Sequence, residues 1–181
     1  PHAEVYTHEM PGGQYSNLQV QAKAVGLGDQ WEEVKTMYHT VNMMFGDIVK
    51  VTPSSKVVGD MALFMVQNNL TEEDVYEKGL EYNFPESVVT FFQGELGQPV
   101  GGFPKKLQQI ILKGRPAFTE RPGALAAPVD FAEVKAELAE KIGYEPKQEE
   151  VLSYLMYPQV FLDYQTAYNM FADVTMLRSE E

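Results

Sequence analysis

The sequence contains no cysteine among its 181 residues and only three histidines. The absence of thiols excludes disulfide scaffolds, thiolate zinc sites and cysteine nucleophiles, and it is compatible with a reducing compartment. No two histidines have the spacing that places them on one face of a strand or helix, so we expect no metal site built from this chain alone. We therefore expect a cytoplasmic protein without a metal of its own.

Positive charge is scarce, because 14 lysines and arginines face 26 acidic residues and the formal net charge is -12. A chain of this charge repels phosphate backbones and anionic lipid, so we expect neither nucleic acid nor a membrane as a partner. No apolar run approaches the roughly 20 residues that span a bilayer, and no basic segment precedes an apolar one as in a signal peptide. The chain starts at Pro1 and not at Met, which leads us to expect a piece of a longer protein.

Apolar residues are sufficient for a core, since 44% of the chain is hydrophobic. They recur mostly at intervals of three and four, which predicts a mainly α fold. We expect the first fifteen residues to be extended or loop, Ser16 and Asp29 to cap the first two helices, and Ile48, Val49 and Val51 to form a short β-like stretch. Helices are predicted over residues 17–25, 30–45, 54–67, 86–92, 105–112, 131–142, 148–156 and 159–171, with a short one after a capping box of Thr71 and Asp74.

Proline and glycine mark the joints between these helices. Residues 114–128 contain three prolines and two glycines, so this stretch is the best candidate for a boundary within the chain. We divide the chain into residues 1–114 and residues 115–181 on this ground.

One segment could carry chemistry, the run KVTPSSK from Lys50 to Lys56. It combines a hydroxyl before Pro53, two more hydroxyls in the first turn of a predicted helix, and a lysine one turn in. Helix N-termini offer free N–H groups to an anionic ligand, although an ordinary cap with an exposed lysine has the same spacing. His8, followed by Glu9, is more simply a solvent-facing histidine.

Two long motifs resemble the pyruvate carboxylase family. They are HEMPGGQYSNL at residues 8–18 and GDIVKVTPSSKVVGDMA at residues 46–62, and FPESVV at 84–89 and GELGQP at 94–99 fit the same family. Related decarboxylase and transcarboxylase subunits share the PGG and SNL elements but typically have HQVPGG and a TPTSQ-like second motif. The resemblance covers essentially the whole chain. It implies a multi-helix funnel that follows a TIM-type barrel in the parent enzyme.

The resemblance also implies a reaction and its residues. Carboxybiotin on a carrier domain outside this chain gives its carboxyl group to pyruvate, which forms oxaloacetate. Thr52 matches the catalytic threonine, a proton relay between the pyruvate methyl group and biotin. Ser55 and Lys56 match residues that hold the biotin ureido oxygen, and Gln14 is a weaker candidate for the same pocket.

The same resemblance implies partners that this chain does not contain. They are the rest of the carboxyltransferase barrel with its divalent metal, the biotin carrier domain, and further copies in a homo-oligomeric parent. We expect the isolated chain to be inactive and to expose apolar surface near Ile48–Val51, with self-association as a consequence. Two alternatives stay open: a decarboxylase or transcarboxylase subunit, and a helical binding module without catalytic activity.

Overall fold

A computed structural model of the chain describes residues 3–177, with side chains described as far as residue 171. The chain divides into two compact units, of which the first ends at Ala126 and the second begins at Ala127. Within the described range the structure is helical without strands, so the predicted mainly α class is confirmed. No helix in this range is long and apolar enough to cross a membrane.

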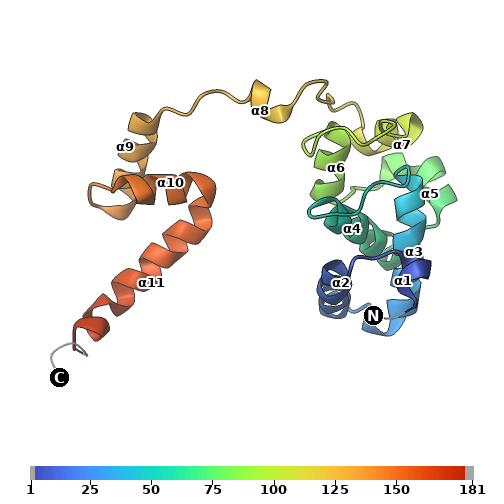
Figure 1. Cartoon of the computed structure of the whole chain (residues 1–181), viewed down its shortest axis with the longest axis horizontal. Coiled ribbons are helices and arrows are strands. Elements are labelled where there is room, and N and C mark those ends of the chain that lie inside the picture. Colours follow the sequence, from blue (N-terminus) through green and yellow to red (C-terminus); the bar gives the residue numbers. More distant parts are fainter. Residues whose placement is uncertain (1–2, 178–181) are drawn as a thin grey trace. The chain divides into compact units, whose positions relative to one another are not determined.

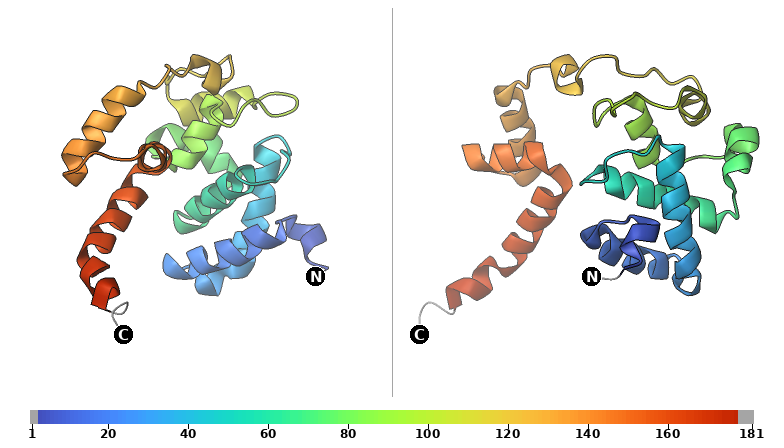
Figure 2. Two further views of the ribbon diagram at one scale, coloured as in Figure 1. Left: turned by 60° about the vertical axis from the view of Figure 1, so that its left-hand side comes forward. Right: turned by 45° about the vertical axis from the view of Figure 1, so that its right-hand side comes forward.

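The first unit is built around two helices that pack against each other, α3 and α4. Helix α2 covers one side of α4, and α6 followed by α7 covers the other, an order that both Figure 1 and Figure 2 show. The helices of this unit are α1 (Val5–His8), α2 (Gly12–Ala24), α3 (Trp31–Met44), α4 (Ser54–Gln67), α5 (Glu72–Lys78), α6 (Glu86–Gln93), α7 (Lys105–Leu112) and α8 (Pro122–Leu125).

The core of the first unit is one continuous apolar cluster, to which α2, α3, α4, α5, α6 and α7 contribute. At one end four aromatic rings meet: Phe45 lies 4.9 Å from Phe92 and 5.8 Å from Phe91, and Phe103 lies within 5.4 Å of both. Such edge-to-face and offset pairs add to the stabilisation from buried area. This cluster fixes the end of α3, and hence the start of the loop that leads to α4.

Three helices form the described part of the second unit, α9 (Phe131–Ile142), α10 (Gln148–Met156) and α11 (Pro158–Leu177). Its core is small and consists of Leu138, Val151, Tyr154 and Phe161. Asp130 caps α9 by accepting hydrogen bonds from the N–H groups of Ala132 and Glu133, as the sequence predicts.

The predicted start of the first long helix was wrong. Helix α2 begins at Gly12, where Tyr15 donates the first intrahelical bond to the Pro11 carbonyl at 2.8 Å, and a short helix α1 precedes it. Ser16 is not a cap, because it lies inside the helix and donates its hydroxyl to the Gly12 carbonyl. Helix α3 likewise begins after a 3-10 turn that contains Asp29, with Gln30 as its N-cap.

The predicted β-like stretch at Ile48–Val51 was also wrong, since these residues form no strand. Their backbone groups bond locally instead: the Ser54 hydroxyl donates to the carbonyls of Val49 and Val51 at 2.7 and 2.8 Å and accepts from the Val51 N–H. A β-strand needs a neighbouring strand to satisfy the hydrogen bonds of its backbone. Here the Ser54 hydroxyl bonds to the backbone groups of Val49 and Val51 instead.

The division between the units falls after Ala126, whereas the sequence boundary was placed after Gly114. Residues in between hydrogen-bond back to the first unit. Phe118 donates its N–H to the Gln93 carbonyl at 2.7 Å, and the Phe118 carbonyl accepts from the Gln98 side chain at 3.1 Å. The irregular segment therefore belongs with the helices that precede it.

Candidate functional site

The four residues singled out in the sequence line one cleft of the first unit. The cleft has a volume of about 760 Å³ and lies between α2, the loop before α4 and the first turn of α4. Its lining comprises Pro11, Gly13, Gln14, Asn17, Val20, Gln21, Lys50, Val51, Thr52, Ser55 and Lys56. The fold thus brings Gln14, which lies on α2, to the same cleft as Thr52, Ser55 and Lys56, which lie before and at the start of α4.

Thr52 is exposed in the cleft wall at the end of the loop that leads to α4. The bond between Thr52 and Pro53 is cis, and Pro53 is the N-cap of α4. The threonine hydroxyl makes no hydrogen bond to any other residue in the described part of the chain. It is therefore open to a ligand in the cleft.

Ser55 and Lys56 occupy the first turn of α4. Ser55 is buried, and its carbonyl accepts a hydrogen bond from the Tyr38 hydroxyl at 3.2 Å. Burial raises the pKa of Tyr38, so this hydroxyl stays a donor across the physiological range. Lys56 is half exposed and donates to Asp60 at 2.5 Å, which leaves two of its three N–H groups for a ligand.

Gln14 carries a buried donor without a partner. Its side chain is 9% exposed, and its Nε2 makes no hydrogen bond within the described residues. The amide lies close to Gly59 of α4, where a Cβ atom would come within 2.6 Å of Nε2. Unpaired buried polar groups are costly, and they mark places where a ligand or water completes the bonding.

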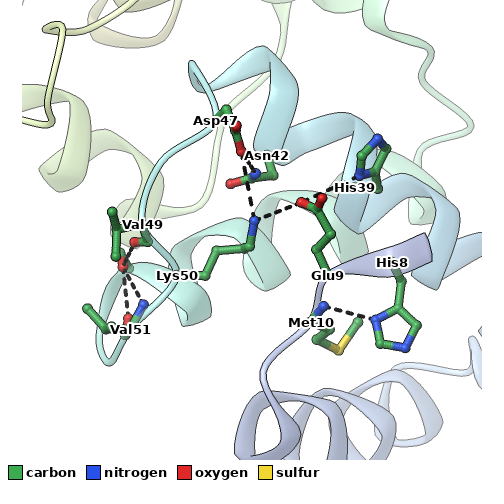
Figure 3. Close-up of polar contacts among 10 residues, drawn as sticks. His8, Glu9, Met10, His39, Asn42, Asp47, Val49, Lys50 and Val51 are labelled. Carbon is green, nitrogen blue, oxygen red and sulfur yellow. Dashed lines mark hydrogen bonds and ion pairs between the residues drawn. The ribbon is translucent and has the colours of Figure 1, made fainter. Parts of the chain in front are cut away.

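A second polar cluster adjoins the cleft and links Lys50, the first residue of the KVTPSSK run, to residues that the sequence did not single out as a site (Figure 3). The Lys50 ammonium lies 3.0 Å from Glu9 Oε2 and 4.0 Å from Asp47 Oδ1. The hydrogen bond and charge of Lys50 lower the pKa of the Glu9 carboxyl. His39 Nδ1 lies 3.8 Å from the same Glu9 oxygen.

His8 was predicted to face solvent, and this was wrong. It is 5% exposed, and its Nδ1 accepts a hydrogen bond from the Met10 N–H at 2.9 Å. Burial, with a contribution from the charge of Lys35, lowers the pKa of His8. A neutral His8 thus braces the turn that leads into α2.

The described residues contain no group of three or more histidine, cysteine, aspartate or glutamate side chains that could hold a metal ion. The second unit contains a different groove of about 830 Å³, between its last two helices, which holds none of the four predicted site residues. The cleft of the first unit is accordingly the place where the predicted residues can act together.

Comparison with known proteins agrees with the motifs. A family described as the conserved carboxylase domain matches residues 5–181. The pyruvate carboxylase of Bacillus subtilis is 61% identical over 177 residues, and that of Staphylococcus aureus is 55% identical over 177 residues. In both cases the match covers 98% of this chain and 15% of the relative, so the chain spans about a seventh of the length of these relatives.

The fold agrees as well. The carboxyl transferase domain of Rhizobium etli pyruvate carboxylase, in a structure with pyruvate and biocytin, matches with a TM-score of 0.89 and 50% identity. This match covers 94% of the present chain and 29% of that one. The resemblance drawn from the motifs is thereby confirmed. The chain belongs to the conserved carboxylase domain family and is similar to part of the carboxyl transferase domain of pyruvate carboxylases.

Proposed function

We propose that this chain supplies one wall of a carboxyltransferase active site, in which a carboxyl group passes from biotin to pyruvate to give oxaloacetate. The observation that carries the proposal is the shared cleft of Gln14, Thr52, Ser55 and Lys56. Support also comes from a solved relative, whose structure contains pyruvate and biocytin, at 50% identity. The remainder of the site belongs to the barrel, which lies outside this chain.

The donors of the cleft fit the ureido group of biotin. Gln14 Nε2 is a buried donor that lacks an acceptor, and Lys56 has N–H groups to spare. A ureido carbonyl accepts several hydrogen bonds, and a cation beside it stabilises negative charge that develops on its oxygen. Biotin, when bound, supplies the carboxyl group. We assign Gln14, Ser55 and Lys56 to holding it.

Thr52 moves a proton in this proposal. Carboxylation of pyruvate requires that its methyl group lose a proton so that the resulting enolate can attack carbon dioxide. A threonine hydroxyl is a very weak base, but its Oγ1 can take that proton while passing its own to the ureido nitrogen of biotin, which would be freed as the carboxyl group leaves as carbon dioxide, so no free alkoxide forms. The open Thr52 hydroxyl is suited to such an exchange.

The barrel is the proposed partner of an apolar surface beside the cleft. Val49 and Val51 are 71% and 59% exposed, and Val100 across a neighbouring hollow is 96% exposed, whereas Ile48 is buried. Exposed apolar patches of this kind mark interaction surfaces. In the absence of the barrel we expect the isolated chain to self-associate, which sedimentation would show.

We further propose a carrier domain and other copies of the chain as partners, and a divalent metal in the barrel. We also propose a cytoplasmic location, which fractionation would test.

The test uses a hybrid enzyme, in which this chain replaces the matching segment of the Bacillus subtilis pyruvate carboxylase. We expect Gln14→Ala and Lys56→Met to lower oxaloacetate formation about 10²- to 10³-fold, since single donors to developing charge have effects of this order. Biotin carboxylation with ATP should be unchanged. Gln19→Ala is the matched control, because Gln19 lies on the same helix outside the cleft lining.

Two results would turn the proposal toward its alternatives. A hybrid that only decarboxylates oxaloacetate would favour a decarboxylase subunit. A hybrid that forms no oxaloacetate with the unaltered chain would favour a helical binding module without catalytic activity, and full carboxylation by both cleft variants would refute the roles of Gln14 and Lys56. The isolated chain is expected to form no oxaloacetate, and activity without the barrel would contradict the proposed division of the site.

A further inference from the structure

The side chain of Lys50 is drawn away from the cleft that its residue lines. Along residues 48–51 the side chains alternate, with Ile48 buried, Val49 and Val51 exposed, and that of Lys50 only 13% exposed. The Lys50 ammonium points to the carboxylates of Glu9 and Asp47, at 3.0 and 4.0 Å (Figure 3). This cation is therefore engaged within the protein rather than presented to a ligand.

Both carboxylates stand on unusual backbone. Glu9 has a φ of 56° and Asp47 a φ of 51°, in the left-handed region that residues other than glycine rarely adopt. Asp47 is further fixed by Asn42 of α3, whose Nδ2 donates to Asp47 Oδ1 at 2.8 Å and which is fully buried. Two turns of rare conformation thus converge on one ammonium group, and such strain concentrates where positioning matters.

The ion pair of Glu9 and Lys50 joins two walls of the cleft. Its partners lie 41 residues apart in the sequence. Glu9 ends α1 and precedes the turn into α2, which carries Gln14, while Lys50 lies two residues before Thr52. The loop that holds Lys50 forms no strand, and the Ser54 hydroxyl ties it to the start of α4, so the pair with Glu9 is a direct polar link between this loop and the segment before α2.

We infer that Lys50 is a positioning residue, which together with Glu9 and Asp47 holds the Thr52 loop at a set distance from the helix that carries Gln14. This inference rests on the proposed function of the cleft. Glu9 and Asp47 are 40% and 65% exposed, so water can solvate them when the lysine is removed. The pair should therefore contribute little to stability and much to geometry.

The experiment replaces Lys50 in the hybrid enzyme by methionine and by arginine, and Glu9 by glutamine. Lys50→Met should lower kcat for oxaloacetate formation about 10- to 100-fold with little change in KM for pyruvate, because a misplacement near 1 Å costs rate on this order. Lys50→Arg keeps the charge and should restore most of the rate. Lys78→Met is the matched control, since Lys78 forms a similar ion pair with Asp74 away from the cleft.

The double variant Glu9→Gln with Lys50→Met should be no slower than the slower single variant, because Lys50→Met already breaks the contact that Glu9→Gln weakens. Losses that multiply would overturn the inference, as would a raised KM with unchanged kcat, which would make Lys50 a substrate ligand. If Lys50→Met fails to fold, Glu9→Gln, at a half-exposed site, carries the same test alone. A normal rate of oxaloacetate formation in Thr52→Ala would instead refute the proposed function. If Thr52→Ala is inactive but the Lys50 variants keep full kcat, only the positioning role of Lys50 is refuted.

Discussion

Replacement of Gly59 by alanine tests how closely α2 and α4 pack beneath the cleft. A Cβ atom at this position would lie 2.6 Å from Gln14 Nε2, and 3.0 and 3.4 Å from the two methyl carbons of Leu18. Alanine favours the helix by about 0.5–1 kcal/mol over glycine. Overpacking in a filled core costs about 1–3 kcal/mol, and Leu18 is fully buried and cannot move freely. The two effects leave a net destabilisation of up to about 2.5 kcal/mol.

The assay is urea unfolding followed by fluorescence of Trp31, the one tryptophan of the chain, which lies in the first unit. Gly12→Ala is the control, because no atom lies within 4 Å of its Cβ position, and it should cause no loss. In the hybrid enzyme Gly59→Ala should also slow oxaloacetate formation, since Gln14 must move. A Gly59→Ala protein as stable as the parent, with Gln14 in place, would refute this packing argument.

Three further predictions concern stability and protonation. Leu138→Ala should destabilise the second unit by about 2–5 kcal/mol, because its core is small. The loss should appear in circular dichroism but not in Trp31 fluorescence. The pKa of Glu9 should be below 4.5 by carboxyl NMR titration and rise in Lys50→Met. The stabilisation from this pair is therefore present above pH 4.5 and fades as the pH falls through the lowered value. The pKa of His8 should be below 6.5, so stability declines as the pH drops under 6.5, and a ring NMR titration at or above that value would contradict its burial.

Local signals in the sequence were sufficient for most helices. Residues 54–67, 105–112, 131–142 and 148–156 are helical as predicted, because each start carries a proline or capping residue and each apolar stripe has the helical period. Thr71 and Asp74 form the expected capping box, with bonds of 3.2 and 3.0 Å in the two directions.

The start of α2 was predicted too late, because residues 1–15, with their two glycines, were expected to be extended or loop. Gly12 and Gly13 adopt helical backbone with open space around them, and packing of Leu18 against α4 repays their low helix propensity. His8 is buried at the turn that leads into α2. The start of α2 and the burial of His8 both depend on tertiary contacts that no local sequence pattern encodes.

The candidate site could be predicted in part. Thr52, Ser55 and Lys56 follow one another in a single motif, so their proximity is local. Gln14 joins them only because Gly59 lets α2 approach α4 closely. The contact of Lys50 with Glu9 spans 41 residues and depends on left-handed backbone, which sequence spacing does not reveal.

The most direct test of the central claim is the rate of oxaloacetate formation by the hybrid enzyme with Thr52→Ala, measured beside biotin carboxylation with ATP. Thr52 is proposed to move the proton of pyruvate, so the account predicts a loss of about 10²–10⁴-fold in oxaloacetate formation, as for other positioned acid–base groups. Biotin carboxylation should survive. If Thr52→Ala forms oxaloacetate at the parent rate, Thr52 is a turn residue before α4, and the cleft does not perform this chemistry.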